Sequence, residues 1–395
     1  MSTELAKKAL RKLLKSAENA KTRGSVARGL PFSEASFPEY LKPRSLAELT
    51  DLHNELVAAE RIGAISIQWD HRSGDRGHVI RIDLQNEEAL ARFLDVIPLW
   101  TLLSTAKEKF QPRAERPQVA ALLEAWANGK RPRERGPEHV DAFVQAMRVI
   151  DEVEGQTDGA LIAVRRMSAQ LFHDSKKIEE LFVELDLLTR ADDGPNRSPD
   201  EIYSELGLQR FPQPFFMAAA PGNFYYIPTG AQREIESPYS APDPETIKGF
   251  RFTGRYILSV ENLTLFQELA RGLGGPIDGL ILYSAGMPSP RWLQAYKRVL
   301  AEAAPAQVFH WGDPDVGGIR AMRKIALAAR SISYELQPFA MDEEVAGHRK
   351  EFTDAEVNYI CRVCNEFGWA SIADRVTKSR GAVEQESQKP RLPLK

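Results

Sequence analysis

Cysteine is scarce in this sequence, and the scarcity limits what its thiols can do. The 395 residues contain 2 cysteines, Cys361 and Cys364, in a Cys-x-x-Cys spacing. Such a pair could be a redox motif or half of a zinc site, but no second pair and no nearby histidine completes a set of metal ligands. The pair shares an apolar helical register with Ile360 and Val363. We therefore expect two reduced, half-buried thiols.

Long apolar runs are also missing. No stretch approaches the roughly 20 apolar residues that a membrane-spanning helix needs. The N-terminal segment MSTELAKKALRKLLKS is charged throughout and has no apolar core followed by a cleavage site, so a secretory signal is not expected. The sequence therefore predicts a cytoplasmic protein. Its length exceeds what one ordinary hydrophobic core serves, which favours two or three domains.

Charge is unevenly distributed. The net charge of −3 gives no overall sign of nucleic-acid binding. The first thirty residues, however, hold only Glu4 and Glu18 as acids against a run of basic residues: Lys7, Lys8, Arg11, Lys12, Lys15, Lys21, Arg23 and Arg28. A locally basic arm fits contact with DNA or with an acidic partner. A solvated amphipathic helix explains it equally well.

Periodicity divides the chain into a helical first part and an alternating last part. Residues 4–20 and 45–60 follow a helical period, and Ser45 with Glu48 forms a capping-box pattern. Apolar and β-branched spacing on either side of DHRSGDRG predicts a β-hairpin over 62–84. Residues 139–188 are helical, and 189–249, dense in Pro, Gly and Asp, indicate the end of a middle domain and a linker.

From residue 250 onward, strand-like and helical segments alternate. RYILSVEN, IDGLILYSAG and AQVFHWGDPD are strand-like, and helical segments separate them. This spacing is typical of βαβ units, so a parallel sheet flanked by helices is expected. Ligand chemistry in such sheets collects beyond the carboxyl ends of the strands.

Three acids stand at those strand ends. Glu261 follows the first apolar run, and Asp313 and Asp315 follow a later one. Residues two apart on a strand project to the same side, so we expect Asp313 and Asp315 to point together. Converging carboxylates suit Mg²⁺ or Mn²⁺, which can polarise a phosphodiester and activate water. Taken alone, Gly-Asp-Pro-Asp is also a common turn, and an acid after an apolar run often only begins a loop.

The pattern of these acids resembles the Toprim domain, which is shared by topoisomerases, bacterial primases and related nucleases. More closely, VENLTLFQEL and HWGDPDVGGIRAMRKI look like the D subunits of the Wadjet plasmid-defence systems, the JetD family. RRMSAQLFHDSKKIEEL and VEQE resemble the same family. The likeness covers the middle and C-terminal two-thirds well and the N-terminal arm only loosely.

The resemblance implies a multidomain α/β architecture. It comprises a mainly helical N-terminal arm with a β-hairpin (1–138), a winged-helix, CAP-like domain with a linker (139–235) and a Toprim catalytic domain (236–395), assembled as a homodimer. It also implies that Glu261, Asp313 and Asp315 bind Mg or Mn and cleave double-stranded plasmid DNA. The implied partner is an SMC-kleisin-type ATPase complex.

The mechanism depends on a tyrosine that this sequence lacks. Topoisomerase VI A-like enzymes use a tyrosine in the winged-helix domain as nucleophile, but the corresponding stretch, residues 165–172, contains none. Ser168 lies there without an evident base. We therefore predict hydrolysis by activated water. A topoisomerase- or primase-like protein is the less favoured enzymatic alternative, and a non-catalytic DNA-binding adaptor is the alternative from another class.

Six basic residues are candidate DNA contacts, because charged donors position phosphates: Arg165, Arg166, Lys176, Lys177, Arg320 and Lys324. The first four could instead pair with Asp174, Glu179 or Glu180, and the last two could form a solvated face. His310 could assist proton transfer, although a buried strand histidine is the favoured interpretation. Glu384 and Glu386 could add to the acidic site or only order the final segment.

Overall fold

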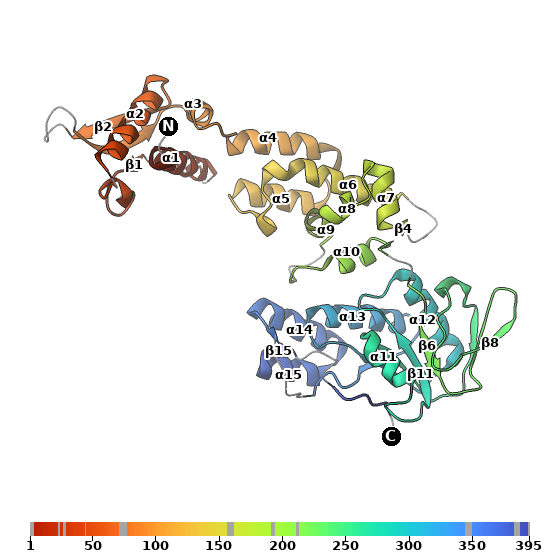
Figure 1. The fold of residues 1–395 in the computed structure, drawn as a ribbon. Helices are drawn as coiled ribbons and strands as arrows, with labels where there is room; N and C mark the ends of the chain where they lie inside the picture. The colour runs from red at the N-terminus through yellow and green to blue at the C-terminus, as the bar shows by residue number, and fades with distance from the viewer. Residues whose placement is uncertain are drawn as a thin grey trace. The chain divides into compact units, whose positions relative to one another are not determined.

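The computed structural model describes residues 4–22, 24–26, 29–43, 45–70, 77–155, 162–190, 194–210, 213–343, 350–382 and 388–393. The chain divides into two compact units, Met1–Gln145 and Ala146–Lys395. Both helices and sheets are present (Figure 1), which confirms the mixed α/β class. No helix in the described ranges has the length and hydropathy needed to cross a bilayer.

The first unit combines helices with a small antiparallel sheet. Its strands pair in the order β1-β3-β2, with the predicted hairpin formed by β2 and β3. Ser45 caps α2 by accepting a hydrogen bond from the Glu48 backbone N–H at 3.1 Å. The elements are α1 (Glu4–Thr22), β1 (Leu30–Pro31), α2 (Leu46–Arg61), β2 (Ile65–Asp70), β3 (His78–Leu84), α3 (Glu87–Phe93), α4 (Leu99–Phe110) and α5 (Pro117–Ala127), followed by α6 (Val140–Glu154), which crosses the boundary between the units.

Some of the basic residues of α1 have partners within this unit. Lys8 forms an ion pair with Glu39, and Lys12 donates to the Ser36 carbonyl oxygen. The opposite face of α1 buries Leu10 and Leu13 in the core of the unit. Part of the basic character of the arm therefore serves local structure, and a role in binding DNA stays a prediction. Arg23 and Arg28 lie outside the described residues.

The second unit begins with short helices and ends with a mixed sheet and its helices. Its first elements are β4 (Ile162–Ala163), α7 (Val164–Phe172), α8 (Lys177–Glu180), α9 (Phe182–Thr189), α10 (Pro199–Glu205) and β5 (Leu208–Gln209). A three-stranded antiparallel sheet of order β8-β7-β9 follows, formed by β7 (Phe224–Tyr226), β8 (Gln232–Glu234) and β9 (Gly249–Arg251).

A five-stranded sheet of order β13-β12-β10-β11-β6 forms the centre of the C-terminal part. Strands β10, β11, β12 and β13 are parallel, and β6 joins the edge antiparallel. The elements are β6 (Met217–Ala219), β10 (Tyr256–Val260), α11 (Leu263–Ala270), β11 (Gly279–Tyr283), α12 (Pro290–Ala303), β12 (Gln307–Trp311), α13 (Val316–Arg330), β13 (Leu336–Pro338), β14 (Lys350–Glu351), α14 (Asp354–Phe367), α15 (Ala370–Ser379) and β15 (Gly381–Ala382).

Burial explains why these apolar runs became strands. Every residue of β10 is buried, as expected for a central strand covered on both faces. Helix α11 packs on β10 and β11, α12 lies beside α13, and α14 packs on α13 (Figure 1). Cys364 is buried and Cys361 half-buried, both as free thiols, which confirms the prediction for the Cys-x-x-Cys pair.

The prediction that 189–249 ends in a linker was partly wrong. Met217–Ala219 forms strand β6, which pairs with Leu280–Leu282 of β11. The sequence signal was misleading because a three-residue strand among prolines and glycines shows no period. This segment is therefore an edge of the sheet.

Candidate active site at the carboxyl edge of the parallel sheet

Glu261 and Asp313 meet where two neighbouring strands end. Val260 of β10 is in register with Trp311 of β12, and the Glu261 N–H donates to the Trp311 carbonyl oxygen at 2.9 Å. The Asp313 N–H in turn donates to Oε2 of Glu261 at 3.0 Å. The structure thus brings these two predicted site residues together, and both side chains are half-buried.

Asp315 has a different local role from the one expected. Strand β12 ends at Trp311, so strand alternation does not govern Asp313 and Asp315. Asp315 is the N-cap of α13, and its Oδ1 accepts the Gly318 N–H at 2.9 Å. This is the usual way in which an aspartate satisfies an unpaired donor at a helix start.

Two glycines allow this close packing. A Cβ at Gly318 would lie 2.0 Å from the Asp313 carbonyl oxygen, and a Cβ at Gly312 would lie 2.6 Å from Oε2 of Glu261. Both separations are far below contact distance, so any side chain would displace the acidic loop. Helix α11 also begins here, capped by Asn262. The N-termini of α11 and α13 therefore directly follow Glu261 and the Asp313–Asp315 loop in the chain, and a helix N-terminus favours negative charge close to it.

His310 lies inside the sheet, at the strand position that pairs with Ser259, two residues before Glu261. It is fully buried, and its Nδ1 is 2.9 Å from Oγ of Ser259, its register partner on β10. Ser259 Oγ donates to the Phe309 carbonyl oxygen at 3.2 Å, so it accepts from Nδ1–H and leaves Nε2 as a bare lone pair. That Nε2 finds no partner within the described ranges and faces the point where a Cβ at Gly312 would stand, 2.7 Å away.

Electrostatics single out Glu261. Burial, together with the charges of Asp313, Asp315 and Glu201, raises the pKa of Glu261 to about 7, while the Asp313 N–H opposes the rise. Burial also raises the pKa of Tyr283, with a smaller contribution from Glu261, so Tyr283 lies near the acids but is held as a neutral phenol. Strongly shifted carboxylates among like charges are typical of functional sites.

The donor set suits a hard cation, although the acids do not converge. Carboxylate oxygens are the ligands that Mg²⁺ and Mn²⁺ prefer. The Nε2 of His310, which has no hydrogen-bond partner among the described residues, lies beside Gly312, as does Oε2 of Glu261. Over the described residues, however, no group of three or more His, Cys, Asp or Glu side chains is arranged to hold an ion. Asp315 would have to turn away from its capping bond to complete a set of three. Glu384 and Glu386 lie outside the described residues.

The four basic candidates of the middle segment lie on α7, α8 and the turn between them. Arg165 and Arg166 are exposed, and Arg165 pairs with Glu179 at 3.5 Å. Lys176 is exposed, whereas Lys177 pairs with Glu180 at 3.1 Å. Both the alternative pairing and an accessible cationic surface are therefore present, and DNA contact at these residues stays a prediction.

Ser168 has a structural role. It is fully buried, its Oγ donates to the Asp174 carbonyl oxygen, and the same oxygen accepts the Ile178 N–H at 3.1 Å. These bonds join α7 to α8 and occupy the hydroxyl. A nucleophilic role for Ser168 is therefore disfavoured.

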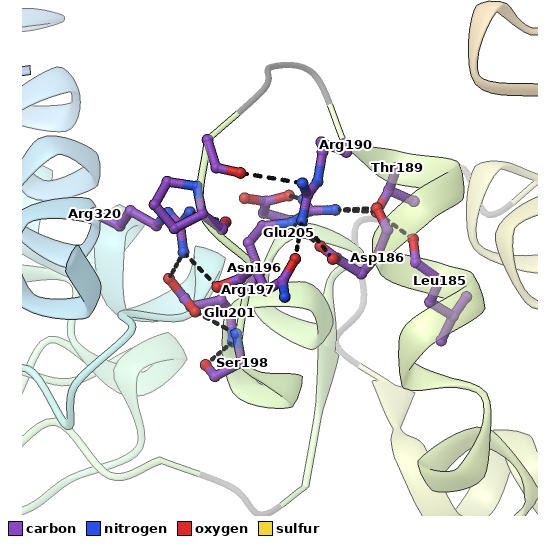
Figure 2. A network of polar contacts seen from close by, with 12 residues as sticks. Leu185, Asp186, Thr189, Arg190, Asn196, Arg197, Ser198, Glu201, Glu205 and Arg320 are labelled. Atoms are coloured by element: carbon purple, nitrogen blue, oxygen red, sulfur yellow. Dashed lines mark hydrogen bonds and ion pairs between the residues drawn. The ribbon is translucent and has the colours of Figure 1, made fainter. Parts of the chain in front are cut away.

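Arg320 and Lys324 lie on α13 but are largely covered. Arg320 forms a buried ion pair with Glu201 of α10 at 3.0 Å and also donates to the Pro195 and Asn196 carbonyl oxygens (Figure 2). Lys324 donates to Oγ of Ser204 at 2.9 Å. These contacts do not resemble the solvated face that was the alternative, and contact with DNA stays a prediction.

Sequence reasoning missed Glu201 and Tyr283. Glu201 belongs to a Ser-x-x-Glu capping box at Ser198, a pattern that signals a helix start and carries no information about an ion pair more than one hundred residues away in sequence. Tyr283 ends the strand beside β10 and could have been found by extending the strand-end argument to β11.

Comparisons with known proteins agree with the resemblance found in the sequence. Residues 232–388 match the family model described as Wadjet protein JetD, C-terminal. The chain is also 25% identical over 266 residues to a protein from Bacillus cereus (strain Q1) named Wadjet protein JetD, and the alignment covers 62% of each. The match thus spans less than two thirds of that relative. Glu261, Asp313 and Asp315 all fall inside the family segment.

Proposed function

We propose, from the match of residues 232–388 to the family model of JetD C-terminal domains, that this protein is the DNA-cleaving subunit of a Wadjet-type plasmid-defence system. In this proposal the C-terminal part is a Toprim nuclease domain, and the segment before it is a winged-helix, CAP-like domain. The observation that carries the proposal is the meeting of Glu261 and Asp313 at the carboxyl edge of adjacent parallel strands.

The acids would hold Mg²⁺ or Mn²⁺, which would polarise the phosphodiester and lower the pKa of an attacking water. The chain itself contributes the frame. Gly312 and Gly318 leave room for the acidic loop, and the starts of α11 and α13 stabilise negative charge there. The desolvation of Glu261, which raises its pKa to about 7, also strengthens its interactions with nearby charges.

Hydrolysis is proposed in place of a covalent intermediate. Residues 165–172 hold no tyrosine, and the hydroxyl of Ser168 is already bonded on both sides. Burial and Glu261 keep Tyr283 protonated by raising its pKa, which makes it a poor nucleophile. Denatured, protease-treated cleavage products should carry no attached peptide, and an attached peptide would contradict hydrolysis.

The proposed partners rest on the same family resemblance. We propose that the subunit acts as a homodimer with an SMC-kleisin-type ATPase complex and cleaves circular plasmid DNA selected by topology and not by sequence. The test compares Asp313→Ala with the wild type in cleavage and in DNA binding. Lost cleavage with retained binding supports the nuclease. Unchanged cleavage would reject this site, and a wild type that binds but never cleaves would favour the non-catalytic adaptor.

A further inference from the structure

A cationic cavity lies beside α13, outside the acidic edge. Its volume is about 290 Å³, which is near the lower limit for small-molecule sites. The charged residues that line it are Arg190, Arg197, Glu205, Arg320, Arg323 and Lys324. Five cations and one carboxylate therefore line the cavity. Most of the cations also pair with acids, but the wall and its paired acids together keep a positive charge, which favours an anionic ligand.

Two buried acids that do not line the cavity, Asp186 and Glu201, hold its arginines in position. Asp186 is fully buried and accepts bonds from both Arg190 and Arg197, each at 2.7 Å (Figure 2). Glu201 holds Arg320 in the same way. Arg197 also pairs with Glu205, so Asp186 and Glu205 together balance the charges of Arg190 and Arg197. Arg323 pairs with Glu366, and the excess positive charge of the cavity is that of Lys324. The arginines are held in place before a ligand arrives, which lowers the entropy lost on binding.

The environment of Lys324 is a second observation that favours an anion-binding site. Its Nζ lies 2.9 Å from the Ser204 hydroxyl, and burial lowers the pKa of its ammonium group while Glu205 and Glu201 oppose the change. A partly desolvated ammonium group beside a hydroxyl is costly when no ligand is bound. A doubly charged anion in the cavity would remove that cost, because it would accept hydrogen bonds from Lys324 and from the guanidinium groups.

We propose that this cavity binds the phosphate monoester group of a free nucleotide or of a phosphorylated DNA end. Guanidinium forks and an ammonium group match phosphate oxygens in geometry and charge. A terminal phosphate carries nearly two charges and is free on one side, whereas a backbone phosphodiester carries one charge and is flanked by sugars. The cavity is too small for a duplex, so only a chain end or a single nucleotide enters. This binding does not depend on the proposed cleavage.

The cavity lies on the helix that follows the acidic loop. Asp315 is the N-cap of α13, and Arg320 follows five residues later, about 7.5 Å along the helix axis at the usual rise per residue. A phosphate in the cavity would therefore be bound by the helix that directly follows the acidic loop in the chain.

The test uses the full chain with the metal chelated, so that cleavage cannot interfere. One arm measures affinity for adenosine monophosphate against adenosine. The other measures affinity for a short DNA duplex with phosphorylated ends against the same duplex with hydroxyl ends. The variant is Lys324→Met, and Lys297→Met on α12, whose side chain is absent from the described cavity wall, is the matched control.

The wild type and the control should prefer the phosphorylated ligand in at least one arm, and Lys324→Met should weaken that binding about tenfold or more. Preference in the nucleotide arm identifies a free nucleotide, and preference in the duplex arm identifies a DNA end. Because the charge of Lys324 is disfavoured by burial, the ligand-free variant should unfold at the same temperature as the wild type or higher, which excludes misfolding as the cause. Equal affinity for both ligands in both arms, or full preference retained in Lys324→Met, would overturn the proposal.

Discussion

His310 shows how one buried side chain sets a pH limit on stability. Burial lowers the pKa of His310 to about 3, whereas an unfolded histidine titrates near 6.5. The unfolded state therefore binds the proton first as pH falls below about 6.5, and stability contributed by the neutral ring is lost toward acid pH.

The first prediction follows from this shift. Between pH 6.5 and pH 5 the wild type should lose about 2 kcal/mol through this group, since one proton contributes about 1.4 kcal/mol per pH unit. His310→Gln should show a flatter dependence of unfolding free energy on pH, measured by urea denaturation. His173→Gln, at an exposed position, is the control and should follow the wild type. An equally steep loss in His310→Gln would contradict the assignment.

Glycines of the acidic loop provide a matched pair for a second prediction. Gly318→Ala would place a Cβ 2.0 Å from the Asp313 carbonyl oxygen, whereas Gly317→Ala meets only the Asp315 side chain at 3.4 Å. We expect Gly318→Ala to destabilise the protein by about 1–3 kcal/mol through overpacking. Gly317→Ala should be neutral or stabilise by up to about 1 kcal/mol through helix propensity. Thermal unfolding distinguishes them, and equal effects of the two changes would be inconsistent with the geometry.

At the scale of elements, the Arg320–Glu201 pair joins α13 to α10. Both side chains are buried, with exposures of 10% and 7%, so removing one partner leaves a charge without compensation. The pair also lies near the acids, since Glu201 contributes to the raised pKa of Glu261. The pair therefore links α13 to α10 and also contributes to the electrostatic environment of the acidic site.

A third prediction is a double-mutant cycle on this pair. Arg320→Met should cost about 3–5 kcal/mol of unfolding free energy. Adding Glu201→Gln should recover part of that loss, because the orphaned carboxylate is removed. Denaturant titrations of the two single variants and the double variant measure the coupling. Strictly additive losses would show that the two side chains do not interact.

The sequence predicted the parallel strands and their acids because long apolar runs ending in Glu261 and in Gly312-Asp313 have few other interpretations. It did not predict the capping role of Asp315, since the end of a strand cannot be placed to one residue by periodicity. It also missed β6 and the ion pair of Glu201, because three-residue strands and contacts between distant segments leave no local pattern. Contacts between segments that are distant in sequence therefore limited what could be predicted.

At the scale of the whole molecule, the features that support the proposed function are concentrated in the second of the two units. The first unit buries its own core around α1, α2 and the hairpin, while the acidic edge, the cationic cavity and the family match all belong to the second. Separate cores allow each unit to keep its own fold. The proposed DNA cleavage would therefore be carried out by the second unit.

Cleavage of circular plasmid by the purified chain, with its SMC-type partners and Mn²⁺ or Mg²⁺, tests the central claim most directly. The wild type should linearise the circle, and Asp313→Asn, which removes the charge at nearly constant shape, should not. Asp278→Asn is the control, because Asp278 is an exposed partner of Arg255, and this variant should cleave like the wild type. Linear product from Asp313→Asn at the wild-type rate would contradict the account.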